Sequence, residues 1–269
     1  MVNSGEKSHP ALFPPSNAGI KMKKSMIVTG GSRGIGAAVS RLAAARGFAV
    51  CVNYQNAREA ADSVVADIVA AGGQAVAVQG DVSNEEDIKR LFDTAETELP
   101  PLASVVNNAG IVSSLKRLDQ KSADDIRRTI NVNLTGVALC CAEAVRRLST
   151  KYGGPGGSIV NVSSAAARIG GANEWIDYAA SKGGIDTLTL GLAAEVGAEG
   201  IRVNAVRPGL TDTDIHAAAG APDRMATIAP NIPMKRAASP EEIANAIVWL
   251  TSDEASYVHG SILDVAGGR

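Results

Sequence analysis

The stretch Met26–Leu42, MIVTGGSRGIGAAVSRL, decides the fold. It starts with a short apolar run, Met26–Gly30, which predicts a strand. The glycine-rich segment Gly31–Gly36 follows, and then apolar residues recur at helical spacing until Gly47 ends the helix. A strand, a glycine turn and a helix in this order are the opening unit of an α/β fold.

The same unit recurs along the chain, so a parallel sheet is expected. Further strands are predicted at residues 48–53, 74–79, 104–107, 158–162, 201–206 and 261–265, with helical patterns between them. Right-handed crossovers turn such a pattern into a doubly wound, Rossmann-type sheet with helices on both faces, here of mostly seven parallel strands.

The pattern also predicts where individual helices begin and end. Ser83 with Glu86, and Ser239 with Glu242 behind Pro240, have the spacing of capping boxes. One long helix is expected over about residues 122–150.

The chain divides into a leader and one large domain. Residues 1–24, rich in Pro, Gly, Lys and Ser, predict a disordered leader. Residues 25–269 form the Rossmann-type domain, in which the weakly periodic segment 210–238 is expected to be a substrate lid.

Composition excludes several classes of function. With 45% hydrophobic residues, 20% charged residues and a net charge of −2, the chain gives no electrostatic reason to expect nucleic acid. The three cysteines, Cys51, Cys140 and Cys141, fit neither a disulfide framework nor a zinc pattern, and we expect no metal. No apolar run approaches ~18 residues, so we expect no membrane span and a cytoplasmic protein.

The first glycine turn, Thr29–Gly36, is a candidate dinucleotide site. Its spacing, T-G-x-x-x-G-x-G, differs from the common G-x-G-x-x-G fingerprint. Glycines permit close backbone approach, and the N-terminus of the next helix offers free N–H groups to a pyrophosphate. The structural alternative is a turn that serves sharp packing alone.

The end of the second strand indicates which nicotinamide cofactor is used. An acid there would bind the ribose 2′-hydroxyl of NAD, but Val52–Asn56 contains none. Arg33 in the glycine turn and Arg58 nearby suit the 2′-phosphate of NADP. We therefore expect NADP(H) in preference to NAD(H), although Arg33 in contact with solvent alone is the plain alternative.

Three further polar sites follow the predicted strands or lie near the cleft. Asp81 is placed to bond an adenine amino group or to cap the next helix, and Asn107–Gly110 to let a cofactor approach. Asn133 is either a tolerated surface amide or a polar group near the cleft, since Asn is mildly unfavourable inside a helix.

The segment Ser163–Lys182, SSAAARIGGANEWIDYAASK, has the elements of a proton-transfer site. If Tyr178 and Lys182 share a helix, their i, i+4 spacing puts both side chains on one face. A lysine ammonium beside a phenol lowers the phenol pKa from about 10 toward neutral pH. A serine hydroxyl aimed at the same point polarises a carbonyl.

With these motifs, residues 24–268 resemble the classical short-chain dehydrogenases/reductases, among them 3-oxoacyl reductases and glucose dehydrogenases. Each motif alone is weak, but their order along the chain is specific. The matching motifs are Thr29–Gly36, Asp81–Val82, Asn107–Gly110, Asn131–Gly136, Ile159–Ser164, Tyr178–Lys182 and Arg207–Gly209.

The resemblance implies a catalytic tetrad and a set of cofactor contacts. The tetrad is Asn133, Ser164, Tyr178 and Lys182; Ser163 does not occupy the catalytic place. The cofactor contacts are Gly30, Ser32, Arg33, Gly34, Ile35, Gly36, Asn53, Tyr54, Asp81, Val82, Asn108, Ala109, Gly110, Tyr178, Lys182, Pro208, Gly209, Thr211 and Thr213. In such a site Tyr178 donates the proton, Lys182 also binds the nicotinamide ribose, and Asn133 holds a water. The family also implies a homotetramer.

The predicted function is NADP(H)-dependent hydride transfer between nicotinamide and a small-molecule carbonyl or secondary alcohol, with Tyr178 as the acid/base. A 3-oxoacyl thioester and a sugar or polyol are the leading substrate classes. The alternative is a non-catalytic cofactor sensor or scaffold on the same fold. His216 is expected in the solvated lid, and His259 in a structural role.

Overall fold

The computed structural model describes residues 24–215 and 220–269, and their strands form one parallel sheet. The strand order is β3-β2-β1-β4-β5-β6-β7, which confirms the doubly wound, seven-stranded prediction. The strands are β1 (Lys24–Val28), β2 (Phe48–Tyr54), β3 (Ala75–Gln79), β4 (Leu102–Asn107), β5 (Gly157–Val162), β6 (Ile201–Pro208) and β7 (Ile262–Val265).

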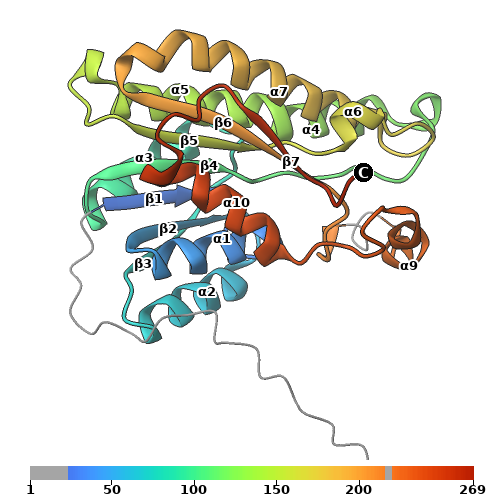
Figure 1. Ribbon diagram of the computed structural model, residues 1–269, viewed down its shortest axis with the longest axis horizontal. Coiled ribbons are helices and arrows are strands. Elements are labelled where there is room, and N and C mark those ends of the chain that lie inside the picture. Colours follow the sequence, from blue (N-terminus) through green and yellow to red (C-terminus); the bar gives the residue numbers. More distant parts are fainter. Residues whose placement is uncertain (1–23, 216–219) are drawn as a thin grey trace, which may run out of the picture.

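Helices cover both faces of the sheet (Figure 1). One layer consists of α1 (Gly34–Ala45), α2 (Arg58–Ala70) and α10 (Pro240–Thr251). The opposite layer consists of α3 (Glu85–Glu98), α4 (Ala123–Ile130), α5 (Gly136–Leu148) and α7 (Ile176–Val196). The short helices α6 (Ala166–Ile169) and α9 (Arg224–Ile228) lie near the carboxyl ends of the strands.

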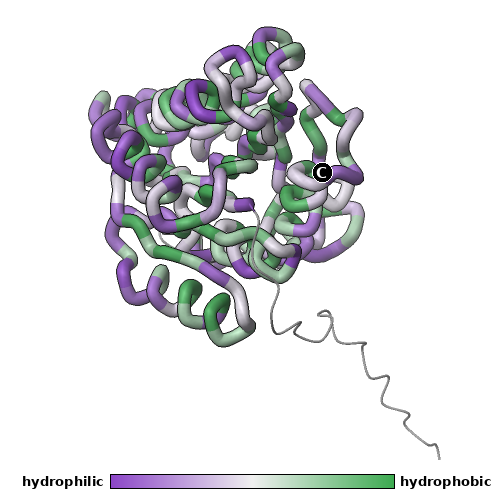
Figure 2. The backbone as a smooth tube through the Cα atoms, turned by 90° about the vertical axis from the view of Figure 1, so that its left-hand side faces the viewer, coloured by the Kyte–Doolittle hydropathy of each residue, from purple (hydrophilic) through white to green (hydrophobic). Residues whose placement is uncertain are grey.

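Each layer encloses its own hydrophobic core. Val39, Ala61 and Ile243 pack on one face of the sheet, whereas Phe92 and Ile185 pack on the other. Figure 2 shows hydrophobic stretches in the interior and hydrophilic residues on the outer turns. The sheet is therefore buried on both faces, as its nearly continuous Val, Ile and Ala content requires.

The long helix expected over residues 122–150 is interrupted. The π-helical turn η2 (Asn131–Thr135) separates α4 from α5, with Asn133 at its centre. Single π-helical turns of this kind are frequent at functional sites.

Of the two predicted capping boxes, one is confirmed and one is wrong. Ser239 and Glu242 cap α10 reciprocally. Helix α3 is capped by Asn84, whose side chain accepts a hydrogen bond from Asp87 N, while the Ser83 hydroxyl donates to Asp81 Oδ1 at 2.7 Å. The chain therefore enters α3 one residue later than predicted, because Asp81 binds both the hydroxyl and the backbone N–H of Ser83.

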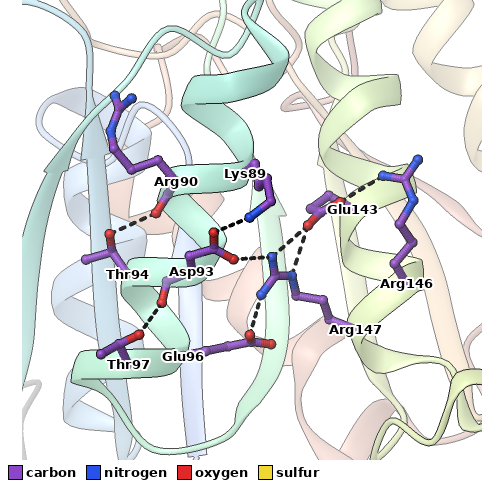
Figure 3. A network of polar contacts seen from close by, with 9 residues as sticks. All are labelled: Lys89, Arg90, Asp93, Thr94, Glu96, Thr97, Glu143, Arg146 and Arg147. Atoms are coloured by element: carbon purple, nitrogen blue, oxygen red, sulfur yellow. Dashed lines mark hydrogen bonds and ion pairs between the residues drawn. The ribbon is translucent and has the colours of Figure 1, made fainter.

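Helices α3 and α5 are joined by ion pairs centred on Arg147 (Figure 3). Its guanidinium donates to Asp93 and Glu143, both at 2.7 Å, and also contacts Glu96. The Arg147 side chain is only 14% exposed, so this network is screened less by solvent than an open surface pair.

The cysteines pack as small apolar residues. All three are free and buried. Burial raises the pKa of Cys51 to about 12 and that of Cys141 to about 12, and it raises the pKa of Cys140 as well.

Two expectations fall on residues outside the described part of the chain. They are the leader, of which only Lys24 is described, and His216. Within residues 24–215 and 220–269 there is no helix whose length and apolarity would let it span a membrane.

Candidate active site

The turn between β1 and α1 is built for close approach of a ligand. Gly30 and Gly34 have φ of +60° and +50°, in the left-handed region that favours glycine. A Cβ at Gly36 would lie 2.2 Å from the Gly30 carbonyl oxygen, so any side chain there would displace the turn. This cradle, at the N-terminus of α1, fits the pyrophosphate of a dinucleotide.

Asn53 at the end of β2 holds this turn in place. Its Oδ1 accepts from Gly30 N at 3.2 Å, and its Nδ2 donates to the carbonyls of Val78 and Gly80 at 3.3 and 3.0 Å. Asn53 is only 2% exposed, so its polar side-chain atoms form hydrogen bonds with backbone groups rather than with solvent. Arg33, the residue before α1, is exposed at the same end of the sheet.

A cavity of about 390 Å³ opens at the carboxyl ends of the strands. It joins the glycine turn to Ser164, Tyr178 and Lys182, although these segments are far apart in the sequence. This is where ligands of doubly wound sheets bind. The predicted cofactor residues that line it are Gly30, Arg33, Gly34, Ile35, Asn108, Ala109, Gly110, Tyr178, Lys182, Pro208, Gly209, Thr211 and Thr213.

The remaining predicted cofactor residues do not line this cavity. They are Ser32, Gly36, Asn53, Tyr54, Asp81 and Val82. Gly36 and Asn53 shape the turn from behind. Asp81 accepts from the Ser83 hydroxyl and from Gln55 Nε2, and it does not cap the next helix as one alternative had it, because the N-cap of α3 is Asn84.

Tyr178 and Lys182 lie on one helix, α7, as their spacing predicted. Lys182 Nζ lies 5.5 Å from the centre of the Tyr178 ring and donates to the Val162 carbonyl oxygen at 2.7 Å. Lys182 is 3% exposed. The ammonium is therefore fixed at the carboxyl end of β5, where Lys182 lines the cavity.

The expected lowering of the Tyr178 pKa does not occur in this structure. Burial raises the pKa of Tyr178, and the Ser164 side chain offsets this only in part. Burial likewise lowers the pKa of Lys182 to about 8, against the opposing effect of Asp186. The prediction was wrong here because desolvation of the phenolate outweighs the benefit of a lysine that is bonded elsewhere.

The two serines have different hydrogen-bond partners. Ser164 lines the cavity, and its Oγ accepts from Ala166 N at 3.1 Å. Ser163 also lines the cavity, but it is only 2% exposed and its hydroxyl donates to the Lys182 carbonyl oxygen at 3.1 Å. Ser163 therefore holds α7 against the end of β5.

Asn133 is fully buried, which excludes the surface-amide alternative. Its Nδ2 donates to the Ile111 carbonyl, its Oδ1 accepts from Ile111 N, both at 2.8 Å, and Nδ2 also lies 3.2 Å from Ser181 Oγ. It does not line the cavity. Its place is behind Gly110, where a Cβ would lie 3.4 Å from Asn133 Oδ1 and 3.6 Å from Lys182 Nζ.

A buried ion pair next to Tyr178 was not predicted. Lys121 Nζ lies 2.5 Å from Asp177 Oδ1, and neither side chain is exposed. Ser113 completes the cluster: it accepts from Lys121 at 2.5 Å and donates to Asp177 Oδ2 at 2.6 Å. Burial alone would raise the pKa of Asp177, but the bonds from Lys121 and Ser113 hold it below its usual range.

The end of the cavity next to α9 was also not predicted in detail. Arg224 of α9 makes a two-pronged ion pair with Glu174, at 2.9 and 2.7 Å, and lies 4.5 Å from the Trp175 ring centre. Trp175 Nε1 donates to the Ser113 carbonyl at 2.8 Å. The surrounding wall is mostly apolar: Val112, Ala165, Ala166, Ile169, Leu210 and Ile215.

His259 has a structural role, as predicted. His259 Nδ1 accepts from Val203 N at 3.1 Å, and its Nε2 lies 2.8 Å from the Ala193 carbonyl oxygen. Among the described residues no three His, Cys, Asp or Glu side chains are grouped to hold a metal ion.

Known proteins resemble the chain over nearly its whole length. The family model described as enoyl-(acyl carrier protein) reductase matches residues 30–269. Uncharacterized oxidoreductase YgfF of Escherichia coli (strain K12) is 51% identical over 90% of this chain and 98% of its own length. A cis-4-hydroxycyclohexanecarboxylate dehydrogenase of Sinomonas cyclohexanicum is 44% identical over 90% of this chain and 94% of its own length. A 3-oxoacyl-[acyl-carrier-protein] reductase of Synechocystis sp. is 39% identical over 90% of this chain and 95% of its own length.

Fold, site and relatives together define a dehydrogenase/reductase on a doubly wound sheet. The chain belongs to the classical short-chain dehydrogenases/reductases, a family of oxidoreductases that use nicotinamide cofactors.

Proposed function

We propose that the protein is an NADP(H)-dependent oxidoreductase that transfers a hydride between nicotinamide and a carbonyl or secondary alcohol, with Tyr178 as the acid/base. One observation carries the proposal: Ser164, Tyr178 and Lys182 line the same cavity as the glycine turn. A non-catalytic sensor or scaffold would not need these three groups beside its cofactor.

The residues of the chain divide the work as follows. Gly30 and Gly36 leave room for the pyrophosphate, and Pro208–Gly209 wall the nicotinamide end. The bound nicotinamide supplies or accepts the hydride. The hydroxyls of Ser164 and Tyr178 hold the substrate oxygen, where negative charge develops during reduction, and Tyr178 delivers the proton.

Lys182 and Asn133 act behind Tyr178. In the proposed complex Lys182 bonds the nicotinamide ribose and stabilises the phenolate left after proton transfer. Asn133 Oδ1 and Lys182 Nζ lie 3.4 and 3.6 Å from the point that a Cβ on Gly110 would occupy, and this open space between them supports a water or proton path there.

The substrate is proposed to be a small, largely apolar carbonyl compound or alcohol. The apolar wall and the pairing of Arg224 with Glu174 support this, since that cation is already neutralised. A panel of cyclic ketones, 3-oxoacyl thioesters and sugars, assayed by NADPH absorbance, tests it. Absence of turnover with every carbonyl and with both cofactors would contradict the proposed function.

Arg33 is proposed to select NADP(H). Replacing it with serine is expected to reduce kcat/KM for NADPH roughly tenfold to a hundredfold, because a charge-assisted hydrogen bond to the 2′-phosphate is lost. The value for NADH should change little. Steady-state kinetics with both cofactors measure the effect.

Arg41→Ala is the matched control, because Arg41 is on α1, the helix that follows Arg33, but bonds Asp67, away from the turn. Equal losses with NADPH and NADH in Arg33→Ser would show that Arg33 does not read the 2′-phosphate.

We further propose a cytoplasmic homotetramer assembled through α5 and α7, the helices on either side of β5 in the chain. Leu190 of α7 is 52% exposed in the single chain, which supports a partner there. Light scattering after size-exclusion chromatography reports the state, and a monomer would contradict this assembly.

A further inference from the structure

Asp186 lies one helical turn beyond Lys182 on α7, and nothing in the proposed mechanism uses it. The i, i+4 spacing puts both side chains on the same face of the helix. Lys182 reaches the Val162 carbonyl at the end of β5, and Asp186 reaches Arg207 at the end of β6. Val162 is paired with Val206, the neighbour of Arg207, so both contacts fall on one patch of the sheet.

Only one of the two carboxylate oxygens of Asp186 has a hydrogen-bond partner among the described residues. Arg207 Nε and Nη2 both donate to Oδ2, at 3.0 and 2.8 Å. Oδ1 is buried and has no hydrogen-bond partner among the described residues. The side chain is 10% exposed. A buried carboxylate oxygen without a partner is costly unless a nearby positive charge compensates it.

The charged groups around this patch alternate in sign. Arg207 also lies 3.7 Å from Asp264 of β7, which in turn lies 3.4 Å from Arg168 of α6. On α7 the other titratable groups near Lys182 are Tyr178 and Asp177, and Asp177 is paired with Lys121. The loop after β4 and the π-helical turn present Gly110 and Asn133, which carry no charge. Asp186 is therefore the anionic side chain nearest to Lys182 along α7, and Arg207 is shared between two carboxylates.

We propose that Asp186 is a positioning residue of the reaction: its carboxylate keeps Lys182 charged at the working pH, and Arg207 fixes where that carboxylate lies. The inference rests on the proposed function, because it assigns Asp186 a role in that site. Burial lowers the pKa of Lys182 to about 8, with Asp186 acting in the opposite direction. Without the carboxylate, Lys182 becomes neutral at a lower pH and no longer stabilises the phenolate of Tyr178.

Asp186→Asn tests the proposal with two readouts. The midpoint at which kcat/KM for carbonyl reduction falls at alkaline pH is expected to move down by roughly one pH unit. The ε-carbon resonance of Lys182, assigned by comparison with Lys182→Arg, should titrate at a correspondingly lower pH. This second readout needs no substrate.

Three variants complete the design. Asp186→Glu keeps the charge and should restore both midpoints. Arg207→Gln removes the competing cation and should move both midpoints upward, so the proposal is tested even where Asp186→Asn folds poorly. Asp67→Asn is the matched control, because Arg41 holds Asp67 Oδ2 through the same two nitrogens, at 2.9 and 2.8 Å, far from Lys182.

The outcomes are distinct. If Asp186→Asn and Arg207→Gln lower Tm but leave both midpoints at their wild-type values, Asp186 merely ties α7 to β6 and the proposal is overturned. If the wild-type protein reduces no carbonyl while the Lys182 resonance shifts as expected, the electrostatic role of Asp186 stands and the proposed function fails.

Discussion

Tyr178→Phe is expected to remove carbonyl reduction while leaving NADPH binding intact. The substitution deletes the hydroxyl that delivers the proton but keeps the ring, which contacts the cavity beside Ser164 and Lys182. Loss of a general acid costs roughly 100- to 10,000-fold in kcat. Turnover from NADPH absorbance and a fluorescence titration of NADPH binding measure the two properties separately.

Tyr152→Phe is the control, because this tyrosine is 61% exposed and does not line the cavity. Near wild-type turnover of Tyr178→Phe would overturn the assignment of the acid. Loss of NADPH binding together with activity would instead assign Tyr178 to cofactor binding.

Lys121→Met is expected to be the most destabilising of the substitutions considered. It leaves Asp177 buried without its partner cation, in a cluster whose side chains are not exposed. Breaking a buried ion pair in this way costs about 3–5 kcal/mol of the free energy of unfolding. Urea denaturation followed by circular dichroism measures the loss. Because Asp177 precedes Tyr178, activity should fall as well.

Lys116→Met, an exposed lysine in the same loop, should change stability by less than about 0.5 kcal/mol. The double variant Lys121→Met with Asp177→Leu should recover much of the loss, since it removes the unpaired charge. A single variant as stable as wild type would show that solvent reaches Asp177.

The buried Lys121–Asp177 pair also predicts that the stability of the protein depends on pH. The pKa of Asp177 is held below its usual range, so the stabilisation is present above the unfolded-state value, about 3.9. It is lost as the pH falls through the folded-state value. Lys121→Met should therefore flatten the acid part of the Tm–pH curve.

The fold could be predicted because its signals are local. Each strand is a short apolar run, and the parallel order follows from the helices between the strands. The same logic brought Ser164 to the cleft, since side chains that follow parallel strands meet at one edge of the sheet. Tyr178 and Lys182 were found by their i, i+4 spacing on one helix and by the family resemblance.

The features of the site that the sequence did not predict depend on packing between distant segments. Lys121 and Asp177 are 56 residues apart, and no spacing rule pairs them. The pKa of Tyr178 is set by how completely the folded chain removes water from its hydroxyl, which the i, i+4 spacing does not report. The π-helical turn at Asn133 likewise depends on the backbone of Ile111, to which its amide is bonded.

The raised thiol pKa values of the buried cysteines have a practical consequence. At neutral pH these groups stay protonated and shielded, so maleimide dyes should leave the folded protein unlabelled. A single cysteine introduced at the exposed Ala226 of α9, near Arg224 at the cavity, would then carry a dye at one known place. Its emission would follow ligand binding in real time, without any native cysteine having to be removed first.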